Sequence, residues 1–416
     1  MVGVLSGLVM VVTVSACGAS DSEASRTTTA PTTNTDGGGA GATTQPSTTT
    51  VPTIPPAPTP AVAAAPTTTG PAGGAACPAQ PNAAITATPD TTLDNLFQSY
   101  GNAGKGATWT GGDGPESVAL AGRELWFFSD SYLGTINNGQ WIRPQTHFIH
   151  NAMVIERRGV LTRTLHKRRR GVPVAFLNPV PQDPAGHGFW PGSMVVSGTT
   201  LQVIGLDMQF SGNGVFSVLG NAVATFALPS LNLIGLQALP ASATVWAGGV
   251  LTDGGYSYLY GSAQNNTYAA RVVGTNLTAP WSYYDGSGWT PNAAAAVPIE
   301  TIGTASHFSV SKVGDLYMFI SKTSWETNEI TAAFGCSPVG PFGPPQPLYA
   351  TPEGAQYPPG DGVVTYGAFA HPELSKSPNT LVVSYDVKAV GPTSGTSTDA
   401  SIYRPRFLDV TVSTTQ

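Results

Sequence analysis

Two aspartates, Asp113 and Asp130, are the residues of this chain whose types and spacing could do chemistry together. They flank an apolar run, a turn with glycine and charged residues, and a second run rich in aromatics, a pattern that predicts a β-hairpin. Two carboxyl groups beside glycines and aromatic rings suit hydrolysis of a glycosidic bond, because one donates a proton and the other acts as base or nucleophile. The alternative is that both are turn residues that accept backbone hydrogen bonds, as Asp beside Gly commonly does.

The register of this hairpin decides where the two carboxyl groups lie. If Leu120 pairs with Leu125 across a four-residue turn, Asp113 lies opposite Tyr132, and Asp130 lies a few positions away in the same ladder. Both aspartates then emerge at the open end of the hairpin. The sequence therefore predicts a carboxylate pair at one edge of a small sheet.

The composition indicates which class of protein carries this aspartate pair. The chain has 416 residues, of which only 10% are charged, with 49 glycines and 36 prolines, which is typical of an extracellular, turn-rich β protein. The net charge of −6 argues against nucleic acid as a partner, because phosphate binding needs a concentrated basic face. One basic cluster, His166–Arg170, is either a solvated turn or a contact for an anionic wall polymer.

The amino terminus, residues 1–17, reads as a targeting segment. Val2–Val14 is almost wholly apolar but too short to span a bilayer, and it ends in small residues before Cys17. This arrangement is similar to a bacterial lipobox, in which the cysteine becomes lipidated and anchors the protein to the outer face of the cell membrane. An ordinary signal peptide with an incidental cysteine is the alternative, and no Lys or Arg precedes the apolar run.

With Cys17 lipidated, two cysteines remain, Cys77 and Cys336. Both would lie outside the membrane, where disulfides persist, and an even remainder favours pairing. We expect a bridge between them; two free, buried thiols are the alternative.

Two segments follow the targeting sequence. Residues 18–83 are rich in Thr, Pro, Ala and Gly with few large apolar residues, which predicts a disordered tether. Residues 84–416 carry strand-like pairs separated by Gly, Pro and Asn turns. Their recurrence at about fifty residues predicts an all-β fold, a five-bladed β-propeller of small antiparallel sheets; a β-sandwich is the competing architecture. The five groups are Glu116–Ser129 with Phe148–Arg157, Gly192–Met208 with Val215–Ala227, Val250–Ser262 with Thr267–Val273, His307–Ser321 with Glu329–Gly335, and Tyr366–Val387 with Ile402–Val412.

Polar groups at equivalent ends of the blades of a propeller converge on one face. Besides Asp113, the candidates for that face are His187, Trp190, His307, and His371 with Glu373.

Several segments of the chain resemble a known family. The chain resembles a family of secreted five-bladed propellers that was long catalogued as domains of unknown function. That family is similar to a second family, which includes endo-D-arabinanases that cleave mycobacterial cell-wall arabinan. The resemblance covers nearly all of the region from Gly111 to Val412 and implies a glycoside hydrolase with Asp113 and Asp130 as its paired aspartates. The matching segments are Gly112–Gly114, Trp126–Gly134, Phe148–Asn151, Phe189–Gly192, Trp281–Trp289, Ser337–Phe342, His371–Leu374 and Leu381–Asp386.

Five further residues are candidates for binding a sugar. Tyr132 and Trp190 could stack on a sugar ring, or equally belong to the core. Asn151 could bind a hydroxyl or instead satisfy backbone groups of a strand, and His371 with Glu373 could form an orienting pair near the carboxylates.

The sequence lacks several motifs that mark other classes of enzyme. The sequence has neither a phosphate-binding glycine loop nor a nucleophile elbow, and its histidines lack the paired spacing of metal ligands, so we expect no cofactor and no metal. No feature marks an oligomer, and a monomer is expected. Three hypotheses follow: a hydrolase of a cell-wall polysaccharide, such as the D-arabinan of arabinogalactan or lipoarabinomannan; a non-catalytic carbohydrate-binding propeller; or a scaffold for periplasmic protein partners.

Overall fold

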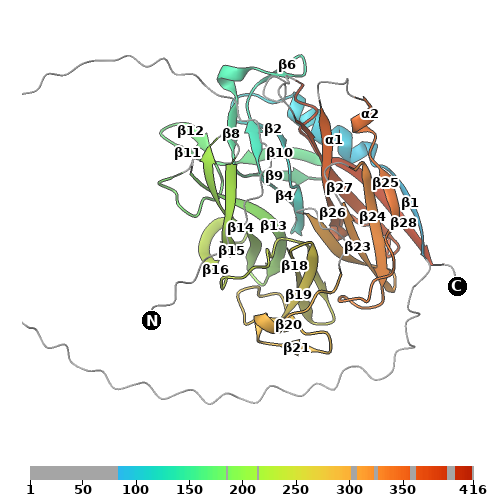
Figure 1. Ribbon diagram of the computed structural model, residues 1–416. Coiled ribbons are helices and arrows are strands. Elements are labelled where there is room, and N and C mark those ends of the chain that lie inside the picture. The colour runs from blue at the N-terminus through green and yellow to red at the C-terminus, as the bar shows by residue number, and fades with distance from the viewer. Residues whose placement is uncertain are drawn as a thin grey trace, which may run out of the picture. The chain divides into compact units, whose positions relative to one another are not determined.

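The protein is described from a computed structural model, which covers residues 83–183, 186–212, 215–300, 307–322, 327–356, 362–390 and 399–414. Most of these residues form strands, arranged in small antiparallel sheets (Figure 1). Helical structure in the described ranges is confined to short segments, namely α1 (Thr91–Asn102), α2 (Glu353–Gln356) and the 3₁₀ turns η1 (Arg143–Gln145), η2 (Ala293–Ala295) and η3 (Pro372–Leu374).

Five sheets have four or five strands each. In sequence order they contain, first, β3 (Glu116–Leu120), β4 (Arg123–Phe128), β9 (Ala152–Arg157) and β10 (Val160–Leu165); second, β13 (His187–Ser197), β14 (Thr200–Gly212), β15 (Val215–Ala227) and β16 (Asn232–Ala238). The third contains β17 (Val250–Asp253), β18 (Tyr256–Ala263), β19 (Asn266–Val273), β20 (Ser282–Tyr284) and β21 (Trp289–Thr290), and the fourth β22 (Phe308–Val313), β23 (Leu316–Lys322), β24 (Glu329–Gly335) and β25 (Gln346–Ala350). The fifth contains β26 (Val363–His371), β27 (Thr380–Ala389), β28 (Arg406–Thr414) and β1 (Ala83–Pro89).

Three smaller sheets complete the described strands. They are formed by β2 (Trp109–Gly112), β5 (Ser131–Leu133) and β8 (His147–Ile149); by β6 (Ile136–Asn137) and β7 (Gln140–Trp141); and by β11 (Lys167–Arg169) and β12 (Val172–Val174).

The first strands of the five large sheets form a closed ring. Strand β3 contacts β13, β13 contacts β17, β17 contacts β22, β22 contacts β26, and β26 returns to β3. This arrangement is a propeller, which confirms the predicted all-β fold and excludes the β-sandwich. Among the strands that were not predicted is β1, which pairs with β28 along its whole length and so adds the beginning of the described chain to the last sheet (blue beside red in Figure 1).

The hairpin of the two aspartates is held by an apolar run that is buried on both faces. Leu125 and Phe127 of β4 pack into the core between the first and second sheets, whereas Trp126 and Phe128 pack into a second core beneath α1. Phe97 of α1 lies at the centre of that second core, with ring contacts to both Trp126 and Phe128. Side chains alternate along a strand, so burial on both sides fixes the register of β4 firmly.

The observed register differs from the predicted one by the length of the turn. Leu120 pairs with Arg123, not Leu125, so the turn has two residues instead of four. Gly122 adopts a left-handed φ of 71°, which glycine tolerates without strain and which makes the tighter turn accessible. As a consequence Asp113 lies opposite Asp130 itself, not opposite Tyr132.

Two predictions concern residues at the margins of the described chain. Cys336 is disulfide-bonded; its predicted partner Cys77 lies outside the described residues, as do Cys17 and the tether, so these assignments stay predictions. In the part of the chain that the structure describes, no helix is long and apolar enough to cross a membrane.

Helix α1 supports the hairpin and depends on its amino-terminal cap. Oδ1 of Asp90 accepts hydrogen bonds from the backbone N–H groups of Thr92 and Leu93, both at 3.0 Å. We predict that Asp90→Ala lowers the free energy of unfolding by about 1 kcal/mol, whereas Asp90→Asn, which keeps the acceptor, changes it little. Urea unfolding of the three proteins checks this, and an equal loss in both variants would contradict a capping role.

Candidate active site

The two predicted aspartates face each other across the backbone ladder just beyond β3 and β4. The N–H of Asp113 donates to the carbonyl of Asp130 at 3.1 Å, and the N–H of Ser129 donates to the carbonyl of Asp113 at 2.8 Å. Gly114 follows with a left-handed φ of 58° and turns the chain into β3. The pair predicted from the sequence is therefore brought together by hydrogen-bonded backbone.

Asp113 has an environment that favours its protonated form. Oδ2 accepts a hydrogen bond from the Tyr366 hydroxyl at 2.6 Å, and the Tyr403 hydroxyl also lies close to the carboxyl group. Burial, followed by the charge of Asp130, raises the pKa of Asp113 to about 6, and Lys388 and the tyrosine hydrogen bonds oppose the rise. A carboxyl group with such a pKa can exchange a proton near neutral pH.

Asp130 is instead held by two donors. Its Oδ1 lies 2.9 Å from Nδ1 of His150 and 2.9 Å from Nε1 of Trp190, and an ionised carboxylate accepts from both. The side chain is 18% exposed, so its second oxygen can still be approached from solvent. The geometry fixes one oxygen of Asp130 and leaves the carboxylate accessible.

A third aspartate, Asp386, lies behind this pair. It belongs to β27, is 1% exposed, and accepts the backbone N–H of Gly114 at both oxygens, at 3.2 and 3.1 Å. Burial, together with the charge of Asp113, holds the pKa of Asp386 well above its usual range. The sequence carried a signal for this residue, because an acid within the apolar run Leu381–Val387 rarely occurs without a role.

Aromatic rings form a wall beside Asp130. The ring of Phe210, at the far end of β14, stacks on His150 with centroids 3.6 Å apart and planes 3° apart. Trp190 contacts the rings of both Phe210 and Phe216. Flat rings of this kind suit the C–H faces of sugars, and their edges carry the donors that orient Asp130.

Tyr132 extends the wall on the other side of the hairpin end. It follows Asp130 by two residues and contacts the rings of Trp141, Phe148 and Tyr403 at centroid distances of 4.9, 5.2 and 5.7 Å. Phe148 is 49% exposed, so this part of the wall is open to solvent. The structure therefore places Tyr132 and Trp190, both predicted to bind sugar, beside the carboxylate pair.

Asn151 lies close by in sequence but has a different environment. It is fully buried; its amide nitrogen donates to the carbonyls of Leu177 and Phe189, both at 2.7 Å, and its oxygen accepts the N–H of Leu177 at 2.8 Å. With its hydrogen-bonding groups occupied by backbone, Asn151 braces the first sheet against the second. This position fits the alternative of backbone satisfaction and not a contact with a sugar.

His371 and Glu373 are not brought to the aspartate pair. His371 ends β26, five positions beyond Tyr366, and its Nδ1 lies 2.5 Å from the Oγ of Ser117, which also donates to Glu373. Ser117 lies on β3, which begins beyond the left-handed turn at Gly114, and no hydrogen bond or ion pair in the described structure joins His371 or Glu373 to either aspartate. The predicted orienting pair therefore belongs to a separate, largely buried network.

Two other histidines named from the sequence, His187 and His307, make no hydrogen bond or ion pair with either aspartate in the described structure. Nδ1 of His187 lies 3.3 Å from Asp183, and His307 packs on Phe369 with its Nδ1 buried and unpartnered in the described structure. Burial lowers the pKa of His307 to about 4. Among the described residues, His, Cys, Asp and Glu form no group of three or more that could hold a metal ion.

Comparisons with known proteins agree with the fold. The site and the ring of sheets define an all-β propeller that presents a carboxylate pair beside an aromatic wall. The chain belongs to the family described as Domain of unknown function (DUF5005), whose model matches residues 94–412. No curated protein matches the sequence. The match to this family confirms the predicted relation to a propeller family of unknown function. The predicted relation to arabinan-cleaving enzymes stays a prediction.

Several solved structures have a similar fold. A protein from Bacteroides ovatus, provisionally described as a hydrolase, is similar with a TM-score of 0.65 and 21% identity over 78% of this chain and 90% of that chain. An exo-beta-1,3-galactanase from Phanerochaete chrysosporium has a TM-score of 0.44 and 12% identity over 72% and 60%. A GH43 protein from Bacillus licheniformis has a TM-score of 0.43 and 10% identity over 80% and 55%. The first of these shares the fold, and the other two are only coarsely similar.

The network around Ser117 predicts how stability depends on pH. Burial and the charge of Glu373 raise the pKa of Glu116 to about 8, and burial raises that of Glu373 to about 7. Because both values lie above the unfolded value of 4.5, these two groups bind more protons in the folded state, and their contribution to stability is greatest below pH 4.5 and falls as the pH rises to about 8.

We predict that Glu116→Gln, which mimics the protonated acid, raises the free energy of unfolding at pH 8 by on the order of 2 kcal/mol and flattens its pH dependence. Denaturant unfolding between pH 5 and 8 checks this, with the exposed Glu329→Gln as control. An unchanged slope in Glu116→Gln would show that Glu116 ionises normally in the folded protein.

Proposed function

We propose that this protein is a glycoside hydrolase that uses Asp113 and Asp130 as its pair of catalytic carboxyl groups. The observation that carries the proposal is the opposition of the two aspartates in one ladder, with unlike environments. Desolvation raises the pKa of Asp113, whereas the carboxylate of Asp130 is held by two donors and is partly exposed. Glycosidic-bond hydrolysis needs two carboxyl groups whose environments separate their roles in this way.

Asp113 is assigned as the proton donor. Its pKa of about 6 leaves a sizeable protonated fraction near neutral pH, and proton transfer is most efficient when the pKa of the acid lies near the working pH. Tyr366 fixes the carboxyl group by its hydrogen bond to Oδ2. Asp386 accepts the backbone N–H of Gly114 and so holds the turn that carries Asp113. It is the third acid of the site.

Asp130 is assigned as the base or nucleophile. His150 and Trp190 orient its Oδ1 and leave the rest of the carboxylate free to face a sugar or a water molecule. Positive charge develops on the sugar ring in the oxocarbenium-like transition state, and a fixed carboxylate beside the ring stabilises it. Tyr132 and Trp190 would hold the sugar on either side through contacts with their ring faces and edges.

The substrate we propose is a cell-wall polysaccharide, in particular the D-arabinan of arabinogalactan or lipoarabinomannan. This choice rests on the motifs shared with the arabinanase-related propellers, several of which, such as Gly112–Gly114 and Phe189–Gly192, surround the carboxylate pair. Lipidation at Cys17 and a tether over residues 18–83 would keep the enzyme outside the membrane and within reach of the wall.

A non-catalytic carbohydrate-binding protein is the second candidate. The aromatic wall around Trp190 and Tyr132 supports it without any chemistry, because stacking alone holds sugars. The two candidates differ in what the carboxyl groups contribute: hydrolysis needs their charge and proton, whereas stacking does not.

We predict that the full chain releases arabino-oligosaccharides from purified arabinogalactan, and that Asp113→Asn and Asp130→Asn each lower the rate by about 10²–10⁴-fold. Each variant removes one proton-transferring or charge-stabilising group with little change in shape. Asp315→Asn, which neutralises an exposed turn aspartate, should leave the rate unchanged. Product analysis by chromatography checks all four proteins.

The opposite pattern would favour the second candidate. If no protein releases sugars while the unmodified chain and both variants bind the polysaccharide equally, the hydrolase proposal fails for this substrate class. Equal release by the unmodified chain and Asp113→Asn would instead remove Asp113 from the mechanism.

A further inference from the structure

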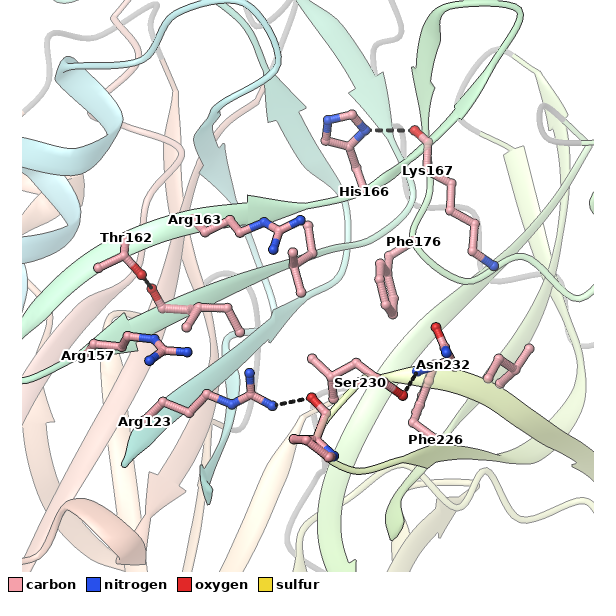
Figure 2. Close-up of a pocket in the computed structure, with 15 residues that line it drawn as sticks. Arg123, Arg157, Thr162, Arg163, His166, Lys167, Phe176, Phe226, Ser230 and Asn232 are labelled. Carbon is pink, nitrogen blue, oxygen red and sulfur yellow. Dashed lines mark hydrogen bonds between the residues drawn. The ribbon is translucent and has the colours of Figure 1, made fainter. Parts of the chain in front are cut away.

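A pocket of about 710 Å³ lies between the first and second sheets, and neither Asp113 nor Asp130 lines it (Figure 2). Arg123 begins β4, and Asp130 lies seven residues further along the same chain segment, which corresponds to roughly 23 Å at ~3.3 Å per residue. The volume falls within the range of ordinary ligand sites. The pocket is therefore a second candidate site, separate from the one described above.

Three arginines continue the apolar rows of the first sheet at this pocket. Arg123 follows the row of Leu125 on β4, and Arg157 follows the row of Ile155 on β9. Arg163 of β10 pairs opposite Ile155, after a bulge, and so joins the same face. On three neighbouring strands, an arginine therefore occupies the next position of a row of apolar side chains, on the side that faces the second sheet.

These arginines have no acidic partner among the described residues. The pocket is lined by Arg123, Arg157, Arg163 and Lys167 together with His166, and no Asp or Glu is part of the lining. The ion pairs found in the described ranges involve none of them. Burial and the charge of Arg157 lower the pKa of Arg123, as expected for like charges held together.

The wall across from the arginines offers polar groups and an apolar floor. Arg123 donates to the carbonyl of Pro229 at 2.9 Å and so joins the two walls. The turn that follows carries Ser230 and Asn232, which also line the pocket (Figure 2). Phe176 lies between the walls with Lys167 6.0 Å from its ring centroid. Charge on one side, small polar groups on the other and a ring between them suit a sugar that carries an anionic substituent.

We propose that this pocket binds a segment of a glycan that bears phosphate or carboxylate groups. Guanidinium groups recognise both phosphate and carboxylate by paired hydrogen bonds. The whole chain has a net charge of −6, so the positive charge at this pocket is specific to the pocket and is not a property of the whole protein. The concave shape and the ring on the floor favour a sugar chain over a lipid surface. The inference does not require the hydrolase activity, because the pocket and the carboxylate pair are separate.

Binding of two anionic glycans to the full chain tests the proposal. The probes are polygalacturonate for carboxylate and a phosphodiester-bearing mannan for phosphate, with neutral dextran as reference, each measured by calorimetry at low and high salt. We expect at least one anionic glycan to bind, with affinity falling as salt rises, and dextran not to bind. The glycan that binds more tightly identifies the anion.

Two double variants of equal charge separate the pocket from general electrostatics. Arg157→Gln with Arg163→Gln removes two exposed pocket arginines, and we expect affinity to fall about tenfold per arginine. Arg169→Gln with Arg170→Gln removes two neighbouring charges outside the lining and should lower affinity less than about threefold. Thermal unfolding of each variant confirms that it is folded.

Three results would overturn the proposal. Equal loss of affinity in the two double variants would show a diffuse basic surface and no pocket. Binding of dextran as tight as that of both anionic glycans would remove the role of the anion. Binding to vesicles containing anionic lipid, or to a DNA oligonucleotide, that is tighter than to either glycan and lost in Arg157→Gln with Arg163→Gln would assign the pocket to another class of partner.

Discussion

The backbone pairing of Asp113 with Asp130 is the constraint on which the rest of the site depends. It follows from the two-residue turn at Gly122 and from the burial of β4 on both faces, because a slip of one residue would exchange the two cores that its side chains fill. The ring of sheets then brings β26 against β3 and supplies Tyr366 to Asp113. The environment of the Asp113 carboxyl group thus depends both on the local hairpin and on the closure of the ring of sheets.

The same hairpin connects regions with opposite electrostatics. Its open end gathers acids in low-dielectric surroundings, where burial and mutual repulsion favour protonation, and its closed end begins a row of arginines. Both arrangements cost free energy of folding unless a proton or a ligand compensates the charge. The apolar cores on either side of β4 stabilise the fold enough to maintain them.

The sequence predicted what depends on local patterns. Alternating apolar runs and turn residues gave the five groups of strands, and the two aspartates could be placed at one end of their hairpin. The turn length could not be read, because Gly122 makes the two-residue turn available as readily as a longer one. Asp386 and Tyr366 were missed because they reach the site only through the closed ring, and Asn151 was misleading because burial, which no local pattern reports, decides its partners.

The interaction of the two aspartates can be measured by NMR titration of the Asp113 carboxyl group, with carbon-13 in the aspartate side chains. We predict a pKa of about 6 for Asp113 in the unmodified chain and a lower pKa in Asp130→Asn, because the charge of Asp130 contributes to the rise. A pKa of Asp113 near the ordinary 3.8, unchanged by Asp130→Asn, would show that the two aspartates do not act on each other as a pair.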